Sequence, residues 1–170
     1  LGLDVERAAE ALSTFTGVRR RFYLVGQVEG VTIVDDYAHH PTEIKATLGA
    51  AAQLGYGHVH VLFQPHRYTR TEALAPMFAD AFEAADTVTL MDVYAAGEAP
   101  IPGVSGKMVV DAVLEYDPTQ QLGWMPHRQE VIPYLVHKIA AGDLVITMGA
   151  GDVTAIGPDL VGALKRNARA

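Results

Sequence analysis

Short apolar runs that are typical of buried strands alternate with helical patterns along most of this sequence of 170 residues. Such alternation favours parallel strands, whose crossover connections place helices on both faces of a sheet. The sequence therefore predicts an α/β fold with a mostly parallel sheet. The expected strands are 22–28, 31–34, 58–63, 87–91, 122–125 and 144–148, and the expected helices are 41–54, 70–84, 107–115, 128–141 and a last one that ends near residue 166.

The N-terminal part departs from this alternation. The first two expected strands follow each other directly through Glu29 and Gly30, which predicts an antiparallel hairpin. Before the hairpin, residues 3–15 carry apolar residues at helical spacing. We interpret 1–16 as the trailing helix of a preceding domain and 17–170 as the α/β domain itself.

Composition excludes several classes of protein. The net charge is -7 and no long basic run is present, which argues against a nucleic-acid partner. The absence of cysteine excludes disulfides and thiolate metal sites. No apolar stretch is long enough to cross a membrane, and the first residues do not read as a secretory signal. We therefore expect a cytoplasmic protein with no membrane partner.

Polar side chains follow the strands at the edge where ligands bind in open α/β sheets, beyond the carboxyl ends of the strands. This clustering after strands, rather than before them, favours a ligand-binding edge over ordinary polar loops. The residues concerned are Asp35, Asp36, His39 and His40 after the second strand, Arg67 and Arg70 after the third, Glu98 in a loop rich in Gly and Pro, and Asp152 after the last strand.

The histidines and aspartates of the first cluster allow two interpretations. They have the chemistry of metal ligands, but the adjacent His39 and His40 would point in different directions at a strand-to-helix turn. We therefore favour hydrogen bonding to an organic ligand and expect no metal site. His40 would alternatively cap the helix that starts at Pro41.

Arginines supply the anion-binding groups. Arg67 and Arg70 lie three residues apart at a helix start, where cations oppose the helix dipole, so we favour binding of a carboxylate or phosphate over a solvated helix end. The run Arg19, Arg20 and Arg21 allows either a solvated face or a phosphate contact. The chain has no P-loop motif and no evident nucleophile, which suggests part of a larger site.

Five motifs occur in a fixed order, and together they closely resemble the C-terminal domain of the Mur ligases over essentially the whole chain. Several long motifs in the correct order are more specific than any single one. The resemblance is strongest to the members that join L-alanine to UDP-N-acetylmuramate. The motifs are G-V-R-R-R-F (17–22), D-D-Y-A-H-H-P-T-E (35–43), F-Q-P-H-R-Y-T-R-T (63–71), D-V-Y-A-A-G-E-x-P-I-x-G (92–103) and M-G-A-G-D (148–152).

The resemblance implies a Rossmann-like domain of a three-domain, ATP-dependent ligase of peptidoglycan precursor synthesis. In that family the first domain holds UDP-N-acetylmuramate, the central domain holds ATP on a P-loop, and the C-terminal domain brings the amino acid. The sugar carboxylate becomes an acyl phosphate with Mg2+, and the amine of L-alanine displaces phosphate. We expect the isolated chain to be inactive and to bind neither ATP nor Mg2+ tightly.

The resemblance also implies roles for individual residues. Tyr37 and His39 match positions that line the amino-acid site, and Arg67 and Arg70 match the pair that receives the alanine carboxylate. Asp36, rather than Asp35, matches the acid that binds the ATP ribose, and Arg20 or Arg21 matches a nucleotide-contacting arginine. For His40, Glu98 and Asp152, only a position at the ligand edge is inferred.

Three other functions remain open. A related ligase that recycles murein peptides shares the D-D-x-A-H-H-P motif, although the H-R-Y-T-R segment favours the alanine enzyme. The chain could instead be a non-catalytic module that binds a nucleotide or another anion. A metal-dependent hydrolase built on His and Asp is the least favoured.

Overall fold

The computed structural model describes residues 20–168, so the predicted helix within 1–16 lies outside the described residues. The described chain forms a six-stranded sheet in the order β1-β2-β6-β3-β4-β5. The strands are β1 (Tyr23–Val28), β2 (Val31–Asp36), β3 (Val59–Phe63), β4 (Thr87–Leu90), β5 (Leu122–Trp124) and β6 (Leu144–Met148). The helices are α2 (Pro41–Ala51), α3 (Tyr68–Leu74), α4 (Lys107–Tyr116), α5 (Arg128–Lys138) and α6 (Ile156–Asn167).

The pairing of the strands confirms the predicted fold class. β1 runs antiparallel to β2, and all other neighbouring strands are parallel. The hairpin turn has positive φ at both Glu29 (50°) and Gly30 (78°), as a two-residue turn between twisted strands requires.

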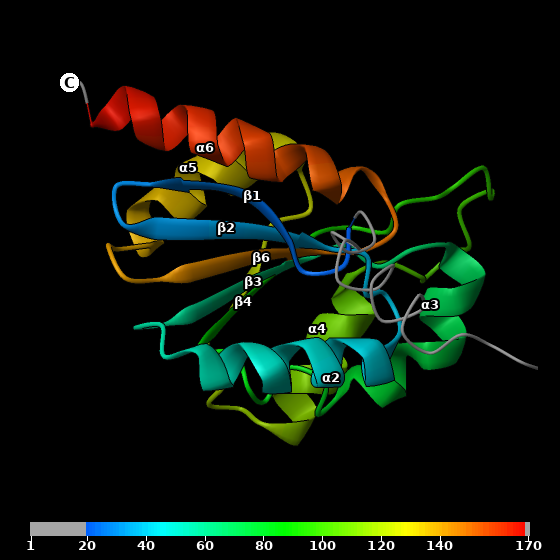
Figure 1. Cartoon of the computed structure of the whole chain (residues 1–170). Helices are drawn as coiled ribbons and strands as arrows, with labels where there is room; N and C mark the ends of the chain where they lie inside the picture. Colours follow the sequence, from blue (N-terminus) through cyan, green and yellow to red (C-terminus); the bar gives the residue numbers. More distant parts are fainter. Residues whose placement is uncertain (1–19, 169–170) are drawn as a thin grey trace, which may run out of the picture.

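Two apolar layers enclose the sheet, with α5 and α6 on one face and α2 and α4 on the other (Figure 1). One layer packs Ile44 and Leu48 of α2 and Val109 of α4 against the sheet. The other packs Leu135 of α5 and Leu160 of α6 against the opposite face. Because both faces are covered, every residue of β2, β3 and β6 is buried.

Several predicted elements differ in extent from the structure. Helices α2 and α5 each end three residues before the predicted ends at 54 and 141. The prediction of one helix over 70–84 was wrong. Helix α3 ends at Leu74, and a short 3-10 helix, Ala75–Phe78, follows it. Pro76 explains the break, because proline lacks a backbone N–H and its ring clashes with the preceding turn. The strand expected to end at residue 34 continues as β2 to Asp36, which pairs with Met148 of β6.

Within residues 20–168, no helix is both long and apolar enough to cross a membrane.

Candidate functional site

The carboxyl ends of three neighbouring strands bring the predicted site residues to one edge of the sheet. Asp36 of β2 and Phe63 of β3 both lie opposite Met148 of β6, so the three strands end in register. The segments that follow them, 37–40, 64–70 and 149–152, therefore leave the sheet side by side. We call this the carboxyl edge.

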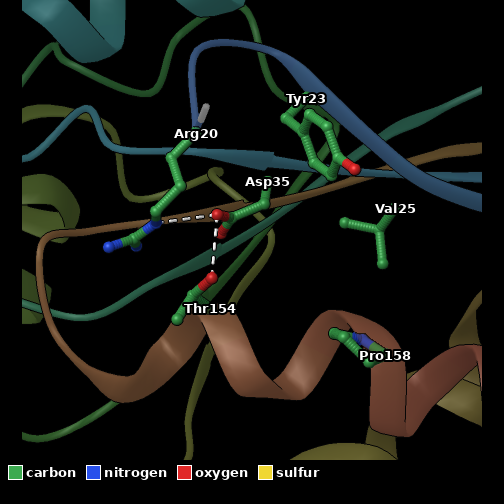
Figure 2. Close-up of a pocket in the computed structure, with 6 residues that line it drawn as sticks. All are labelled: Arg20, Tyr23, Val25, Asp35, Thr154 and Pro158. Carbon is green, nitrogen blue, oxygen red and sulfur yellow. Dashed lines mark hydrogen bonds and ion pairs between the residues drawn. The ribbon is translucent and has the colours of Figure 1, made fainter. Parts of the chain in front are cut away.

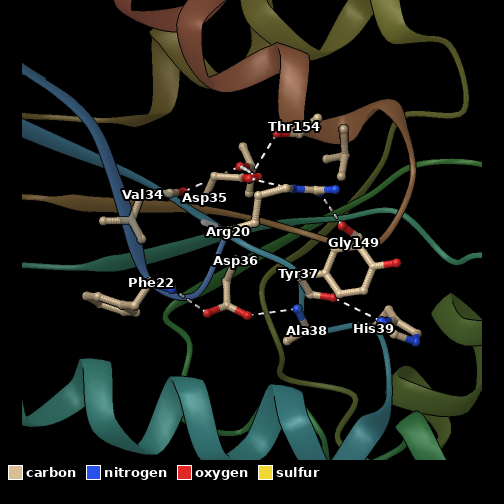
Figure 3. A network of polar contacts seen from close by, with 12 residues as sticks. Arg20, Phe22, Val34, Asp35, Asp36, Tyr37, Ala38, His39, Gly149 and Thr154 are labelled. Carbon is tan, nitrogen blue, oxygen red and sulfur yellow. Dashed lines mark hydrogen bonds and ion pairs between the residues drawn. The ribbon is translucent and has the colours of Figure 1, made fainter. Parts of the chain in front are cut away.

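Asp35 and Asp36 point to opposite faces, because successive residues of a strand alternate. Asp35 is 3% exposed and accepts hydrogen bonds from Arg20 Nε (2.9 Å), Thr147 Oγ1 (2.8 Å) and Thr154 Oγ1 (2.9 Å). Asp36 is equally buried and accepts the backbone N–H of Phe22 and of Ala38, both at 2.7 Å (Figure 3). Asp36 therefore holds the backbone before β1 and the backbone after β2. The role of Asp36 in binding the ATP ribose stays a prediction.

Arg20 and Arg21 occupy different environments. Arg20 has a left-handed backbone (φ 62°), donates from Nη2 to the carbonyl of Gly149 (2.6 Å) and lies over the ring of Tyr37, 4.9 Å from its centroid. With its bond to Asp35, the Arg20 guanidinium is held in place. The Arg21 side chain is 52% exposed and approaches only the carboxylate of Glu43, at 3.8 Å, among residues 20–168.

A hollow of about 420 Å3 opens between β1 and the start of α6 (Figure 2). Its lining combines an ion pair with an exposed aromatic ring and a hydroxyl group. The residues are Arg20, Tyr23, Val25, Asp35, Thr154 and Pro158. The hollow lies on the α6 side of the sheet, whereas the Asp36 carboxylate lies on the α2 side.

His39 and His40 have separate roles at the start of α2. His40 is the N-cap: its Nδ1 accepts the N–H of Thr42 (3.3 Å), which confirms the capping interpretation. Glu43 completes a capping box by accepting the N–H groups of His39 (3.1 Å) and His40 (3.2 Å). The ring of His39 meets Tyr37 edge to face, with 5.2 Å between centroids.

The segment after β3 lies beside His39, at the start of α2. His66 lies 6.1 Å from His39 and 5.7 Å from Tyr94, centroid to centroid, and stacks on Tyr94. Burial lowers the pKa of His66, and the charges of Arg70, His39 and Arg67 lower it further. Nδ1 of His66 is buried without a hydrogen-bond partner in the described part of the chain. His66 therefore lies beside His39 with a pKa below its usual value.

Glu98 links the next loop to this segment. Its carboxylate accepts Arg67 Nε (2.6 Å), Thr69 Oγ1 (2.7 Å) and Thr69 N (3.1 Å). The Thr69 hydroxyl is the main cause that lowers the pKa of Glu98 to about 2, and the N–H of Thr69 and Arg67 assist against desolvation. Glu98 is thus an ionised partner of Arg67 at neutral pH.

The structure brings together Tyr37, His39, Arg67 and Glu98 but sets Asp152 apart. Asp152 is exposed beside α5, with its carboxylate 3.6 Å from Arg128. The sequence interpretation missed Glu43 and Thr154, and it did not single out His66. The capping-box spacing of Glu43 and the position of His66 inside H-R-Y-T-R were the available signals. Among residues 20–168, no group of three or more His, Asp or Glu side chains could hold a metal.

Comparison with known proteins identifies the family. Residues 20–151 match the family model described as Mur ligase, glutamate ligase domain. The chain belongs to the Mur ligase family. It is 50% identical, over 98% of its length, to the UDP-N-acetylmuramate–L-alanine ligase of Pelotomaculum thermopropionicum. It spans only 36% of that relative, and the similar enzyme of Desulforamulus reducens, at 47% identity, is also spanned over 36%.

Two solved Mur ligases share the fold. The UDP-N-acetylmuramate–alanine ligase MurC of Thermotoga maritima superposes with a TM-score of 0.74 and 27% identity, over 98% of this chain and 34% of that one. A murein peptide ligase of Psychrobacter arcticus gives a TM-score of 0.75 over 96% of this chain and 33% of that one, at 24% identity. At that identity the second likeness concerns the fold alone.

Proposed function

We propose that this chain is the C-terminal domain of an ATP-dependent ligase that joins L-alanine to UDP-N-acetylmuramate in peptidoglycan precursor synthesis. The observation that carries the proposal is the cluster of Arg67, Arg70 and His39 at the carboxyl edge, in a chain about half identical to ligases of that name. ATP and a UDP-sugar are cytoplasmic metabolites, so we also propose a cytoplasmic location.

The amino-acid site is proposed at Tyr37, His39, Arg67 and Arg70. Arg67 uses only Nε toward Glu98, and within residues 20–168 its two Nη groups have no hydrogen-bond partner, so they can receive a carboxylate. Arg70 lies one helical turn further on and forms no ion pair with any carboxylate of residues 20–168. Two arginines three residues apart on a helix start can converge on one carboxylate.

The nucleotide contact is proposed for Arg21 rather than Arg20. Arg20 already serves Asp35, the Gly149 carbonyl and the Tyr37 ring, whereas the guanidinium of Arg21 is half-exposed. An exposed arginine fits a phosphate group well. Asp36 fits the ribose less well, because both its oxygens accept backbone N–H groups. Bound ATP with Mg2+ would supply the phosphoryl group that activates the sugar carboxylate.

The contribution of this domain to the reaction is then positioning. The arginines fix the carboxylate of alanine, which holds the amine near the activated acyl group and makes the step effectively unimolecular. Closure of the carboxyl edge over the other domains would exclude water, which competes with the amine for an acyl phosphate.

A ligase that recycles murein peptides is the second candidate, since such an enzyme shares the fold. The test is the full-length protein incubated with ATP, Mg2+ and UDP-N-acetylmuramate, with product followed by mass spectrometry. Addition of L-alanine should give amide and release ADP. Product formed from an L-alanyl peptide but not from L-alanine would support the recycling enzyme, and no product with either amine would contradict both.

A further inference from the structure

The hydrogen bonding of His39 fixes which of its ring nitrogens carries the proton. Nδ1 lies 2.9 Å from the carbonyl oxygen of Tyr37. A carbonyl only accepts hydrogen bonds, so Nδ1 must carry the hydrogen. In the neutral ring, Nε2 therefore holds a lone pair, on the side of the ring away from Tyr37 (Figure 3). Nε2 has no hydrogen-bond partner within residues 20–168.

A carboxylate stands behind the same ring. Glu43 Oε2 lies 3.7 Å from Nδ1 of His39, one helical turn along α2. Burial would raise the pKa of Glu43, but the N–H groups of His39 and His40 and the charges of His39 and Arg21 lower it below its usual value. At this distance the carboxylate does not hydrogen-bond the ring, so the Tyr37 carbonyl orients the imidazole and the charge of Glu43 would stabilise its protonated form.

The groups around His39 determine where a ligand amine would lie. Tyr37 and Glu43 flank the Nδ1 side of the ring. His66 faces the ring from the β3 side, and Arg67 and Arg70 are close enough to act on His66. An α-amino acid whose carboxylate is held by the arginines has its ammonium group only two bonds from the carboxyl carbon, and His39 is a base within the same group of side chains.

The geometry points to His39 as a catalytic base of the ligation step, with Glu43 as the nearby carboxylate that stabilises its protonated form; this rests on the proposed function. The ammonium of alanine gives one proton to Nε2, and the amine lone pair forms the C–N bond at the acyl phosphate carbon. The bond between the acyl carbon and the bridging oxygen breaks, and its electron pair leaves on that oxygen with the phosphate. The second proton of the attacking nitrogen leaves on the phosphate, and Nε2 returns its proton to water.

The main test is His39→Asn in the full-length ligase, because the Asn amide keeps a donor for the Tyr37 carbonyl but offers no base at Nε2. We expect kcat to fall by about 10²- to 10⁴-fold, with a much smaller change in the KM for L-alanine. The loss should shrink at high pH, where more of the alanine amine is already neutral. Glu43→Gln keeps the capping acceptor and should move the acidic limb of the pH–kcat profile to lower pH.

Replacing L-alanine by hydroxylamine distinguishes a role of His39 as a base from a structural role. Hydroxylamine is a neutral amine near neutral pH, so it should trap the acyl phosphate in His39→Asn at the wild-type rate. His58→Asn, which removes another imidazole beside a carboxylate but at the opposite edge, should leave kcat and its pH profile unchanged.

Three results would overturn the inference in different ways. Wild-type kcat and pH profile in His39→Asn would remove the base role while leaving the ligase function standing. Loss of the hydroxylamine reaction in that variant would show that His39 acts on the fold or on acyl phosphate formation. A wild-type protein that forms no amide from L-alanine would contradict the proposed function itself.

Discussion

The Nε of Arg67 donates a 2.6 Å hydrogen bond to the carboxylate of Glu98, so the loop after β4 holds the guanidinium that follows β3. The backbone of Arg67 is left-handed (φ 70°), and its N–H donates to the carbonyl of Tyr94 (2.8 Å) in the same loop. A non-glycine residue with this φ persists only where surrounding contacts impose it. The two loops therefore hold the guanidinium by its Nε, and its Nη groups have no hydrogen-bond partner in the described part of the protein.

Replacement of Glu98 by Gln should loosen this presentation. The amide keeps the size of the side chain but loses the charge that holds Nε, so we expect the KM for L-alanine to rise more than kcat falls. Steady-state kinetics with varied L-alanine would show it. Glu72→Gln, an exposed acid on α3, is the matched control and should change neither constant. Equal constants for Glu98→Gln and wild type would contradict a positioning role.

Arg67→Ala should weaken alanine binding directly. Loss of a charge-assisted hydrogen bond costs about 1.5–3 kcal/mol, which is roughly a 10- to 150-fold rise in the KM for L-alanine. Binding of UDP-N-acetylmuramate, measured by calorimetry, should stay nearly unchanged. Arg128→Ala removes an arginine that pairs with Asp159 on the outer helices and serves as the control. Unchanged alanine kinetics in Arg67→Ala would rule out the carboxylate assignment.

The sequence was sufficient for the sheet and for most of the carboxyl edge. Periodicity located each strand within a few residues, because β2, β3 and β6 are buried on both faces and are almost continuously apolar. The sequence did not reveal that the carboxylates of Asp35 and Asp36 accept hydrogen bonds from Arg20, from Thr154 and from backbone N–H groups. Except for the N–H of Ala38, these partners lie 14 or more residues away in the sequence, and the local pattern does not show which distant segments meet.

Asp143 should be a principal stabilising residue at the opposite, amino edge of the sheet. It is 3% exposed and accepts His60 Nε2 (3.0 Å), the N–H of His58 (3.1 Å) and the N–H of Ala140 (2.8 Å). Asp143→Ala leaves the buried His60 ring without this acceptor and removes two further hydrogen bonds, so we expect a loss of about 2–3 kcal/mol. Urea unfolding would measure it, and a loss below the error of the method would contradict the assignment.

The same carboxylate predicts a pH dependence of stability. Burial alone would raise the pKa of Asp143, but hydrogen bonds from Ala140, His60 and His58 outweigh it and lower the pKa. A lowered folded-state pKa adds stability above the unfolded value of about 3.9, and this is lost as pH falls through the folded value. Asp143→Asn should therefore flatten the fall in unfolding free energy below about pH 4. An unchanged slope would mean that other acids dominate.

Gly106→Ala tests the packing at the start of α4. An added Cβ would collide with the carbonyl oxygen of Met91 and with the ring of Trp124. Overpacking of this kind costs about 1–3 kcal/mol. Thermal unfolding should show a lower midpoint, whereas Gly49→Ala, where a Cβ meets nothing within 4 Å, should not lower it. Equal stability of both variants would show that β4 and β5 shift to accommodate the methyl group.

The His60–Asp143 pair lies at the amino edge of the sheet, and His39 and Arg67 lie at the carboxyl edge, at the opposite ends of the same strands. A five-residue strand such as β3 spans roughly 16 Å, which exceeds the ~10 Å over which substitutions usually interact. Changes at the two ends should therefore combine additively. Substitutions that raise stability at the amino end could therefore offset the stability lost through substitutions that alter activity at the carboxyl end. The same compensation is open to mutations that arise in evolution.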